Sequence, residues 1–370
     1  MINRKDFLQQ VRVYFLFLLS IGVFSGCYML PMNGSYTGPV PRPPELDEYY
    51  SKEGSYHSFN EKIVKERNGY SQKNIVIQSD AGEITIDYFF QDEPNDDLVF
   101  VFPVLGGRPM LSKYFAKYFA REGLDAAVVA RVNDFKEKEN FLQIEEVLRK
   151  GVVRDRIAID FFEKEYGKKD FGTFGMSRGG INVAISAGVD ERFRYNIIAM
   201  GGSGLVDIFE SSREHRIRRF IKEVREEQGI SREEFFDYLR QNVITDPTAV
   251  AKHMDARDTL LMISTCDKTV PYRNGLQLRD EIGNPETIVL AAGHKTSVLF
   301  TQFLPVLPPW SEVCIFPFDY IETEATHFFN EKFERDTFIT RVKLLPFRLL
   351  RLIPSVAVQI FDLLVGVDEP

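Results

Sequence analysis

The sequence predicts an α/β fold built on a mostly parallel sheet, and two observations lead to this prediction. First, strand-like and helix-like patterns alternate along the chain between residues 98 and 291, as in proteins whose parallel strands are joined by crossover helices. Second, several strand-like segments are continuous apolar runs, such as residues 98–104. Uninterrupted apolar character is typical of strands that are buried on both faces.

The expected elements follow one another in a regular order. An apolar hairpin is expected at residues 75–90, with an Asp-Ala-Gly turn at 80–82. Further strands are expected at residues 98–104, 126–130, 170–174, 195–200, 258–264 and 286–291. Helices are expected between them, at 114–121, 141–166 and 177–187, and a strongly charged helical segment occupies 205–250.

Length, composition and charge exclude several classes of protein. The 370 residues, 44% of them hydrophobic and 27% charged, are enough for one large domain with extensions or for two smaller ones. The net charge of −8 provides no general footprint for nucleic acid. Three cysteines do not support a disulfide framework. The mean hydropathy of −0.18 excludes a protein with many membrane spans.

The first residues have the pattern of an export signal. Basic residues precede a twelve-residue apolar run at 13–24, which is shorter than the ~20 residues of a spanning helix. The run ends in Phe-Ser-Gly-Cys at residues 24–27, which resembles a bacterial lipobox with Phe24 in place of the usual Leu. This resemblance implies cleavage after residue 26 and acylation of Cys27, with the chain held to a membrane of the cell envelope. Tyr28 follows the cysteine, so the inner-membrane retention signal, Asp, is absent and the outer membrane is favoured. An uncleaved single-helix anchor is the alternative.

Two segments lie outside the alternating pattern. Residues 27–73 hold five prolines between positions 31 and 44, which predicts a stiff, extended tether. Residues 306–370 form an apolar and basic C-terminal extension in which prolines and charges interrupt every apolar stretch. This extension is compatible with lying on a membrane surface or with packing against the main domain or a second subunit.

One motif indicates a nucleophilic serine. Residues 175–179 read Gly-Met-Ser-Arg-Gly and match G-x-S-x-G. The motif falls between the strand at 170–174 and the helix at 177–187, which is the context that a serine on a sharp strand-to-helix turn requires. Small flanking residues allow the backbone to turn this sharply. The helix N-terminus then favours negative charge near Ser177.

A serine hydroxyl needs a base, and the base needs a carboxylate that orients it. Asp267 follows a strand by three residues and is the predicted acid, with Asp207 as the alternative. His294 lies in a glycine-flanked loop after the last strand and is the predicted base. It is the one histidine of five in such a position. The order serine, acid, histidine is the one expected for a nucleophile on such a turn.

The same turn predicts where an oxyanion would be stabilised. The backbone N–H of the residue after the nucleophile, Arg178, is one expected donor. The second donor is expected in the loop at residues 103–109, which contains two glycines, and we assign it to Leu105 or Gly106. This loop lacks the His-Gly dipeptide that is common in lipases.

Residues 74–305 resemble the α/β-hydrolase superfamily in these motifs and in their order. The resemblance implies an eight-stranded, mostly parallel sheet. It also implies that an insertion after the sixth strand forms a cap, which places the helical cap insertion at about 205–250. Residues 1–26 then form the signal peptide.

The resulting functional hypothesis is a lipid-anchored serine hydrolase. Among serine hydrolases, a carboxylic-ester hydrolase that acts on a small-molecule ester is favoured. Peptidase and acyltransferase reactions use the same three residues and remain alternatives. A non-catalytic surface lipoprotein with a hydrolase fold is a further alternative. The sequence shows no metal-ligand cluster and no nucleotide fingerprint, so no cofactor and no metal are expected. It leaves the acyl group, the alcohol and the oligomeric state open.

Overall fold

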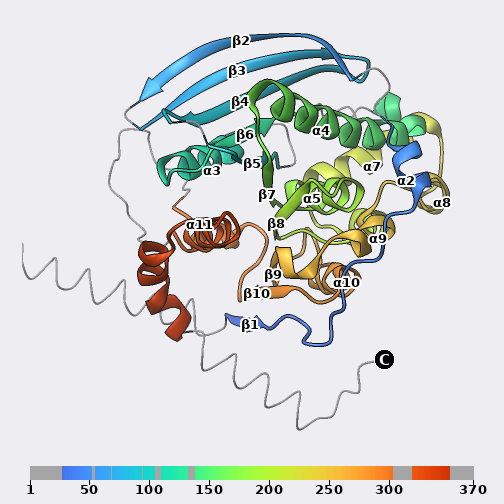
Figure 1. Ribbon diagram of the computed structural model, residues 1–370. Coiled ribbons are helices and arrows are strands. Elements are labelled where there is room, and N and C mark those ends of the chain that lie inside the picture. Colours follow the sequence, from blue (N-terminus) through green and yellow to red (C-terminus); the bar gives the residue numbers. More distant parts are fainter. Residues whose placement is uncertain are drawn as a thin grey trace, which may run out of the picture.

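A mixed β-sheet forms the centre of the protein (Figure 1), and its ten strands come from the described residues. This computed structural model describes residues 27–51, 55–67, 69–93, 95–104, 110–131, 138–302 and 319–350. The strands are β1 (Tyr28–Leu30), β2 (Tyr56–Arg67), β3 (Tyr70–Ser79), β4 (Gly82–Gln91), β5 (Asp97–Phe102), β6 (Ala126–Val129), β7 (Asp170–Met176), β8 (Phe193–Ala199), β9 (Thr259–Ser264) and β10 (Glu286–Leu290).

Helices connect and cover these strands. They are α2 (Pro44–Tyr49), α3 (Met110–Arg121), α4 (Ile144–Tyr166), α5 (Arg178–Val189), α6 (Leu205–Ser211), α7 (His215–Gln228), α8 (Arg232–Asn242), α9 (Pro247–Val250), α10 (Tyr272–Ile282) and α11 (Tyr320–Lys332). Residues 338–350 are also helical.

The order of the strands is β1-β10-β9-β8-β7-β5-β6-β4-β3-β2. The six strands from β10 to β6 are parallel. β1 pairs antiparallel with β10, and β4, β3 and β2 continue the sheet beyond β6 as antiparallel strands. The predicted α/β fold with a mostly parallel sheet is therefore confirmed. The predicted number of eight strands was wrong, because β1 and β2 add a strand at each end.

Helices cover both faces of the sheet and create two apolar layers. On one face, Phe115 and Phe119 of α3 and Phe329 of α11 pack against the strands. On the other face, α4, α5 and α10 contribute a second cluster, with Phe162 of α4 among its largest members. Strands such as β5 supply alternate side chains to the two layers, which explains why their sequences are continuously apolar.

The segment that precedes β3 differs from the extended tether that we predicted. Residues 28–30 pair with β10, and β2 pairs with β3 along its whole length. Between them, Arg42 donates hydrogen bonds to the carbonyl oxygens of Ala187 (2.8 Å) and Gly188 (3.1 Å) at the end of α5. The many prolines and glycines of this segment suggested an extended tether. The contacts could not be predicted from the local sequence, because their partners lie far along the chain.

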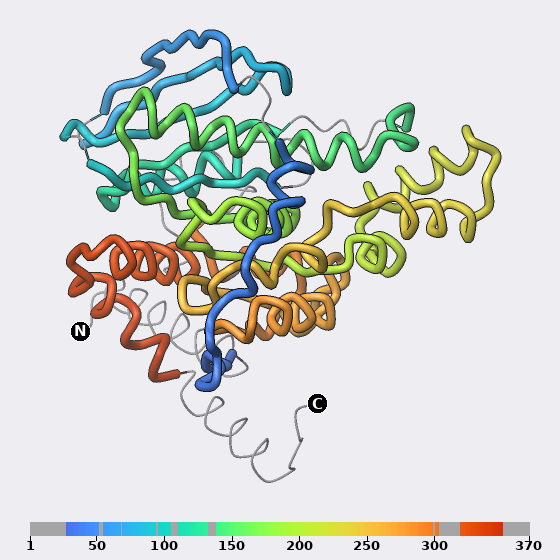
Figure 2. Tube along the Cα trace, turned by 45° about the vertical axis from the view of Figure 1, so that its right-hand side comes forward, coloured from blue at the N-terminus to red at the C-terminus, as the bar shows by residue number. Residues whose placement is uncertain are grey.

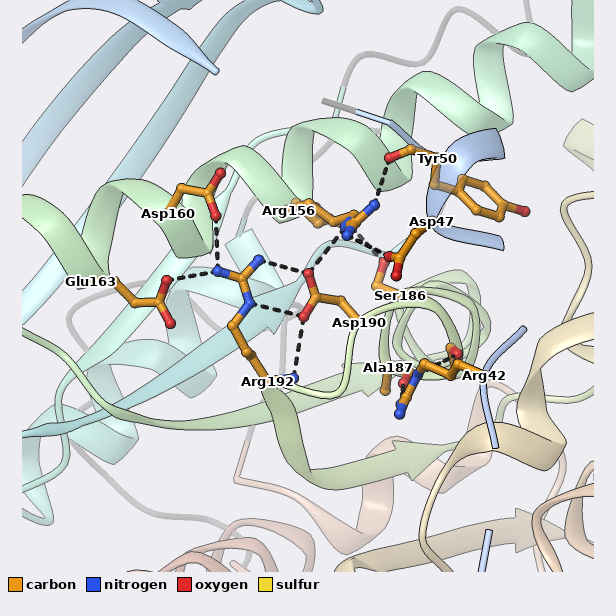
Figure 3. Close-up of polar contacts among 12 residues, drawn as sticks. Arg42, Asp47, Tyr50, Arg156, Asp160, Glu163, Ser186, Ala187, Asp190 and Arg192 are labelled. Carbon is orange, nitrogen blue, oxygen red and sulfur yellow. Dashed lines mark hydrogen bonds and ion pairs between the residues drawn. The ribbon is translucent and has the colours of Figure 1, made fainter. Parts of the chain in front are cut away.

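A network of charges fastens the same segment to α4 and α5 (Figure 3). Asp190 accepts hydrogen bonds from Arg156 (3.1 Å) and Arg192 (2.7 Å). Arg156 also donates to the carbonyl oxygen of Tyr50 (2.7 Å) and to Asp47 (2.8 Å). Burial by itself would raise the pKa of Asp190, but the two arginines lower this pKa to about 2.

The C-terminal extension contributes a core helix. Tyr320, Ile321 and Phe329 of α11 are fully buried. Of the two interpretations of this extension, packing against the main domain therefore applies to α11. The following helix, residues 338–350, has several exposed apolar side chains, including Phe338 and Leu349. The other residues of the predicted extension, 306–318 and 351–370, lie outside the described residues.

The insertion between β8 and β9 is helical, as expected. It contains α6, α7, α8 and α9, and Figure 2 shows α7 and α8 standing out from the body of the protein. Phe220 of α7 and Phe235 of α8 share an apolar cluster with Phe141. The rings of Phe141 and Phe235 are stacked, and their centroids lie 4.8 Å apart. The cap is thus attached to the residues that lead into α4.

Candidate active site

Ser177 occupies a strained turn between β7 and α5. Its φ is 56° and its ψ is −124°, a conformation that costs on the order of 1–3 kcal/mol for a residue with a Cβ atom. Two backbone hydrogen bonds hold the turn. Ser177 N–H donates to the carbonyl oxygen of Ala199 (2.8 Å), and Ile181 N–H donates to that of Ser177 (3.1 Å). The turn exposes the serine hydroxyl at the carboxyl ends of the parallel strands.

The glycines of the motif allow a close approach of three chain segments. A Cβ atom at Gly175 would lie 2.3 Å from the carbonyl group of Gly179. A Cβ atom at Gly179 would lie 2.4 Å from the carbonyl oxygen of Phe102. Neither position accepts a side chain without a backbone shift, so the motif is a steric requirement of this turn.

The structure brings Ser177, His294 and Asp267 together in one hydrogen-bonded chain. His294 Nε2 lies 2.7 Å from Ser177 Oγ, and His294 Nδ1 lies 2.6 Å from Asp267 Oδ2. The second carboxylate oxygen of Asp267 accepts backbone N–H groups from Thr269 (2.8 Å) and Val270 (2.9 Å). The side chain of Asp267 is 2% exposed. These bonds orient the carboxylate so that it accepts Nδ1–H and leaves Nε2 to accept the serine proton.

The competing residues lie elsewhere. Asp207, the alternative acid, is exposed on α6. His57 pairs with Asp80 on the surface, and His253 bonds the carbonyl oxygen of Val40. His327 bonds Thr340 in the C-terminal region. Asp267 occupies the place that the hypothesis assigns to the acid.

Arg178, the predicted oxyanion donor, is the first residue of α5. N–H groups in the first turn of a helix have no acceptor within the helix, so they can point at a ligand. Arg178 is partly buried, and its Nε donates to Asn182 (3.3 Å). Burial, and then the charge of nearby Arg131, lower the pKa of the Arg178 guanidinium to about 9. Leu105 and Gly106 lie outside the described residues.

Comparisons with known proteins support the architecture. No protein-family model matches the chain, and no curated protein matches it. Two similar solved structures are acetyl xylan esterase 1 from Thermoanaerobacterium sp. JW/SL YS485 and an acetyl xylan esterase from Paenibacillus sp. R4. The first has a TM-score of 0.52 and 13% identity, over 72% of this chain and 94% of that one. The second has a TM-score of 0.51 and 16% identity, over 68% and 87%. The chain has an α/β-hydrolase fold.

The cap of this hydrolase fold is tied to the loops that carry Asp267 and His294. Arg213 N–H donates to the carbonyl oxygen of Lys268 (2.7 Å). The Lys295 ammonium lies 3.3 Å from Glu214. Each contact involves a residue adjacent in sequence to the predicted acid or base. The start of the cap is therefore placed directly beside the hydrogen-bonded chain.

Asp246 was not among the predicted site residues, although it shapes the site. Its carboxylate accepts backbone N–H groups from Gly204 (3.0 Å), Leu205 (2.5 Å) and Thr248 (2.8 Å). It thus fixes the first turn of α6 and also caps α9. The Asp-Pro pair at 246–247 is a typical helix start and could have revealed the capping role. The contact with α6 carries no local sequence signal.

Two cavities meet at Ser177. One lies beneath the cap and reaches Ser177 and Arg178. The other is lined by both Ser177 and His294. The arrangement can hold a substrate whose two halves extend in different directions from the serine hydroxyl.

The described residues show neither a metal centre nor a spanning helix. In that part of the chain, no group of three or more His, Cys, Asp or Glu side chains is placed to hold a metal ion. No helix there combines the length and the apolarity that crossing a membrane requires. Cys27, the predicted lipid attachment site, is described and is fully buried in the apolar core.

Proposed function

We propose that the protein is a serine hydrolase that cleaves carboxylic esters through an acyl-enzyme. The observation that carries this proposal is the continuous chain of hydrogen bonds from Ser177 through His294 to Asp267, with distances of 2.7 and 2.6 Å. The solved structures with a similar fold are named as esterases, and this agrees with the proposal. At their low identity they do not indicate which acyl group or alcohol this chain accepts.

The proposed reaction uses each of these three residues. Ser177 Oγ attacks the ester carbonyl carbon while His294 Nε2 takes its proton. The resulting oxyanion accepts hydrogen bonds from Arg178 N–H and from the predicted donor at Leu105 or Gly106. His294 then gives the proton to the leaving alcohol, and the acyl group stays on Ser177. Water repeats the sequence, with His294 as base, and releases the acid. Asp267 keeps the imidazole oriented and stabilises imidazolium.

A fluorophosphonate probe tests the proposal, because it reacts with an activated serine. We expect labelling of the wild-type protein, and no labelling together with a loss of esterase activity of at least about 10⁴-fold in Ser177→Ala. Ser211→Ala is a matched control, since Ser211 ends α6 and bonds only its own helix. A folded wild-type protein that takes up no probe would refute the proposal. It would favour the alternative of a non-catalytic binding protein.

Amide hydrolysis and acyl transfer use the same three residues. A product assay with added alcohols separates acyl transfer from hydrolysis, because a transferase forms a new ester and a hydrolase releases free acid. Free acid as the main product, and a much lower rate on the matching amide, would support ester hydrolysis.

We also propose that the N-terminal segment holds the protein to a membrane of the bacterial cell envelope. The residue after Cys27 favours the outer membrane over the inner one. The lipobox-like residues 24–27 support acylation of Cys27, whereas the burial of the Cys27 side chain favours the uncleaved anchor. Metabolic labelling with palmitate distinguishes the two. Label that is lost in Cys27→Ser supports the lipoprotein, and membrane-bound protein without label supports the uncleaved helix.

A further inference from the structure

The cavity beneath the cap has an almost entirely apolar lining. Twelve of its sixteen lining residues are Ile, Leu, Val or Phe. They come from α4, α5 and the cap, for example Leu148, Ile185 and Val206, and one of them, Val270, comes from the loop after Asp267. The polar lining residues include Ser177 and Arg178, and these lie where the cavity meets the strained turn. The cavity is therefore an apolar space with its polar groups at the reactive end.

The cavity beside His294 has a mixed lining. Its apolar residues are Val104, Leu111, Met176, Met200 and Val298, and it also holds the charged residues Glu214, Arg216 and Lys295 and hydroxyl-bearing residues such as Thr301. Charged and hydroxyl-bearing side chains hydrogen-bond with polar groups, whereas the cavity beneath the cap offers almost only van der Waals contact. The two halves of a substrate would thus meet unlike surroundings.

The chemistry of the three residues decides which half enters which cavity. His294 must give its proton to the leaving oxygen, so the leaving group has to lie on the side of His294. His294 lines the mixed cavity and is not among the residues that line the apolar one. The acyl group extends from the same carbonyl carbon in the other direction. This direction leads past Arg178 into the space beneath the cap.

We infer that the cavity beneath the cap binds the acyl chain of the substrate, and that the substrate class is esters of apolar acids of about six or more carbons. This inference rests on the proposed function. It goes beyond that function by assigning the acyl and alcohol sides and by excluding acetyl as the preferred acyl group.

The apolar cavity is held open by contacts that do not depend on a ligand. Asp246 fixes the first turn of α6, which supplies Leu205 and Val206 to the lining. The Lys295–Glu214 ion pair and the Arg213–Lys268 hydrogen bond hold the start of α7 against the catalytic loops. A preformed site loses less free energy on ordering when it binds a ligand. Apolar cavities in proteins stay dry and take up apolar ligands.

The size of the expected effect follows from the burial of methylene groups. Each buried CH₂ contributes about 0.8 kcal/mol, which corresponds to about a fourfold gain in kcat/KM if the contact persists in the transition state. Contacts that are partly lost or strained reduce this gain. We therefore expect kcat/KM of the full-length protein to rise at least tenfold from 4-nitrophenyl acetate to 4-nitrophenyl hexanoate.

Two neighbouring residues offer a matched test. Val243 lines the apolar cavity, whereas the side chain of Ile244 is 56% exposed and does not line it. Val243→Trp fills the cavity and should lower the hexanoate-to-acetate ratio of kcat/KM at least tenfold. Ile244→Trp adds a similar bulk outside the cavity and should leave the ratio unchanged. Val206→Trp fills the cavity from α6 and serves if Val243→Trp does not fold, as judged by circular dichroism.

The outcomes separate this inference from the proposed function. A ratio that rises with chain length and falls in the cavity-filling variant supports the inference. Equal rates for all chain lengths in a protein whose Ser177 is labelled by fluorophosphonate would overturn it and leave the hydrolase proposal intact. An equal effect of Val243→Trp and Ile244→Trp would also overturn it. A protein without label and without ester hydrolysis contradicts both.

Discussion

Two buried aspartates lie at opposite ends of the parallel strands and have different partners. Asp267, beyond the carboxyl end of β9, contacts a histidine whose charge can change. Asp190, just before the amino end of β8, lies between two arginines whose charge is permanent. Both side chains are at most 5% exposed. The difference shows that burial of a carboxylate does not by itself indicate chemistry, because the partner decides whether a proton can move.

The largest effect is expected at the carboxylate that faces histidine. Asp267→Asn no longer accepts Nδ1–H in the required way, so the imidazole loses its tautomer and orientation. We expect kcat for ester hydrolysis to fall by about 10³- to 10⁴-fold with the fold intact. Asp207→Asn, at the exposed alternative acid, should leave kcat unchanged. A similar loss in both variants would remove the distinction between Asp267 and Asp207.

A smaller effect, on stability alone, is expected at the carboxylate between arginines. Asp190→Asn removes the counter-ion that Arg156 and Arg192 share. Breaking a buried ion pair typically costs about 3–5 kcal/mol, and we expect a loss near the lower end because both arginines keep other carboxylate partners. Urea unfolding followed by circular dichroism measures this loss. Asp96→Asn, which removes an exposed ion pair with Lys169, is the control and should change little. An unaltered unfolding midpoint in Asp190→Asn would show that the network of Figure 3 does not stabilise the N-terminal segment.

A third carboxylate, Glu322 of α11, sharpens the comparison, because its hydrogen-bond donors are neutral and both burial and the nearby Asp319 carboxylate raise its pKa. Burial raises its pKa to about 7, although hydrogen bonds from Tyr114 and the backbone N–H of Gln302 oppose the shift. An acid whose folded pKa lies above its unfolded pKa stabilises the fold at low pH and loses this stability as the pH rises.

For Glu322 the loss falls between about pH 4.5 and 7 and amounts to about 3 kcal/mol. Glu322→Gln cannot ionise, so we expect it to raise the free energy of unfolding relative to wild type at pH 8 more than at pH 5. Glu334→Gln, at an exposed position, is the control. The same difference from wild type at both pH values would contradict the raised pKa.

The smallest effect concerns acid unfolding through Asp190. Its pKa is lowered from 3.8 to about 2, so its contribution is complete above about pH 4 and is lost as the pH falls towards 2. The expected loss over this range is about 2 kcal/mol. The free energy of unfolding of Asp190→Asn should therefore fall less than that of wild type between pH 4 and pH 2.5. Parallel pH profiles would show that the arginines do not lower this pKa.

Much of the fold could be predicted because its signals are local. The eight predicted strands correspond to β3 through β10. From β5 onward their apolar runs reflect burial on both faces, whereas β3 and β4 are only partly buried and were found from their apolar residues around a turn. β1 and β2 gave no such signal. β1 has only three residues, and β2 is exposed along almost its whole length and carries five charged residues. The buried helix α11 was also missed, because its partners on α3 and the sheet lie some two hundred residues earlier.

The arrangement of the site was predictable where the turn itself dictates it. The glycines around Ser177 carry a steric requirement, and Asp267 and His294 follow strands whose order fixes which loops meet. The contacts of Glu214 and Asp246 were not predictable, because a charged residue on a cap helix resembles any solvent-exposed one. The apolar cavity was equally hidden, since its lining is assembled from five helices, α4 to α8, and from loop residues.

The far edge of the sheet has a consequence for how the protein behaves in concentrated solution. β2 ends the order of the described strands and pairs with β3 on one side only. Twelve residues of open edge would offer another chain a template for cross-molecular β-pairing. Along this edge stand Glu61, Lys62, Lys65, Glu66 and Arg67, and such charges oppose the approach of a second edge. A β2 in which these residues are replaced by Thr or Val should therefore aggregate at concentrations that the natural chain tolerates.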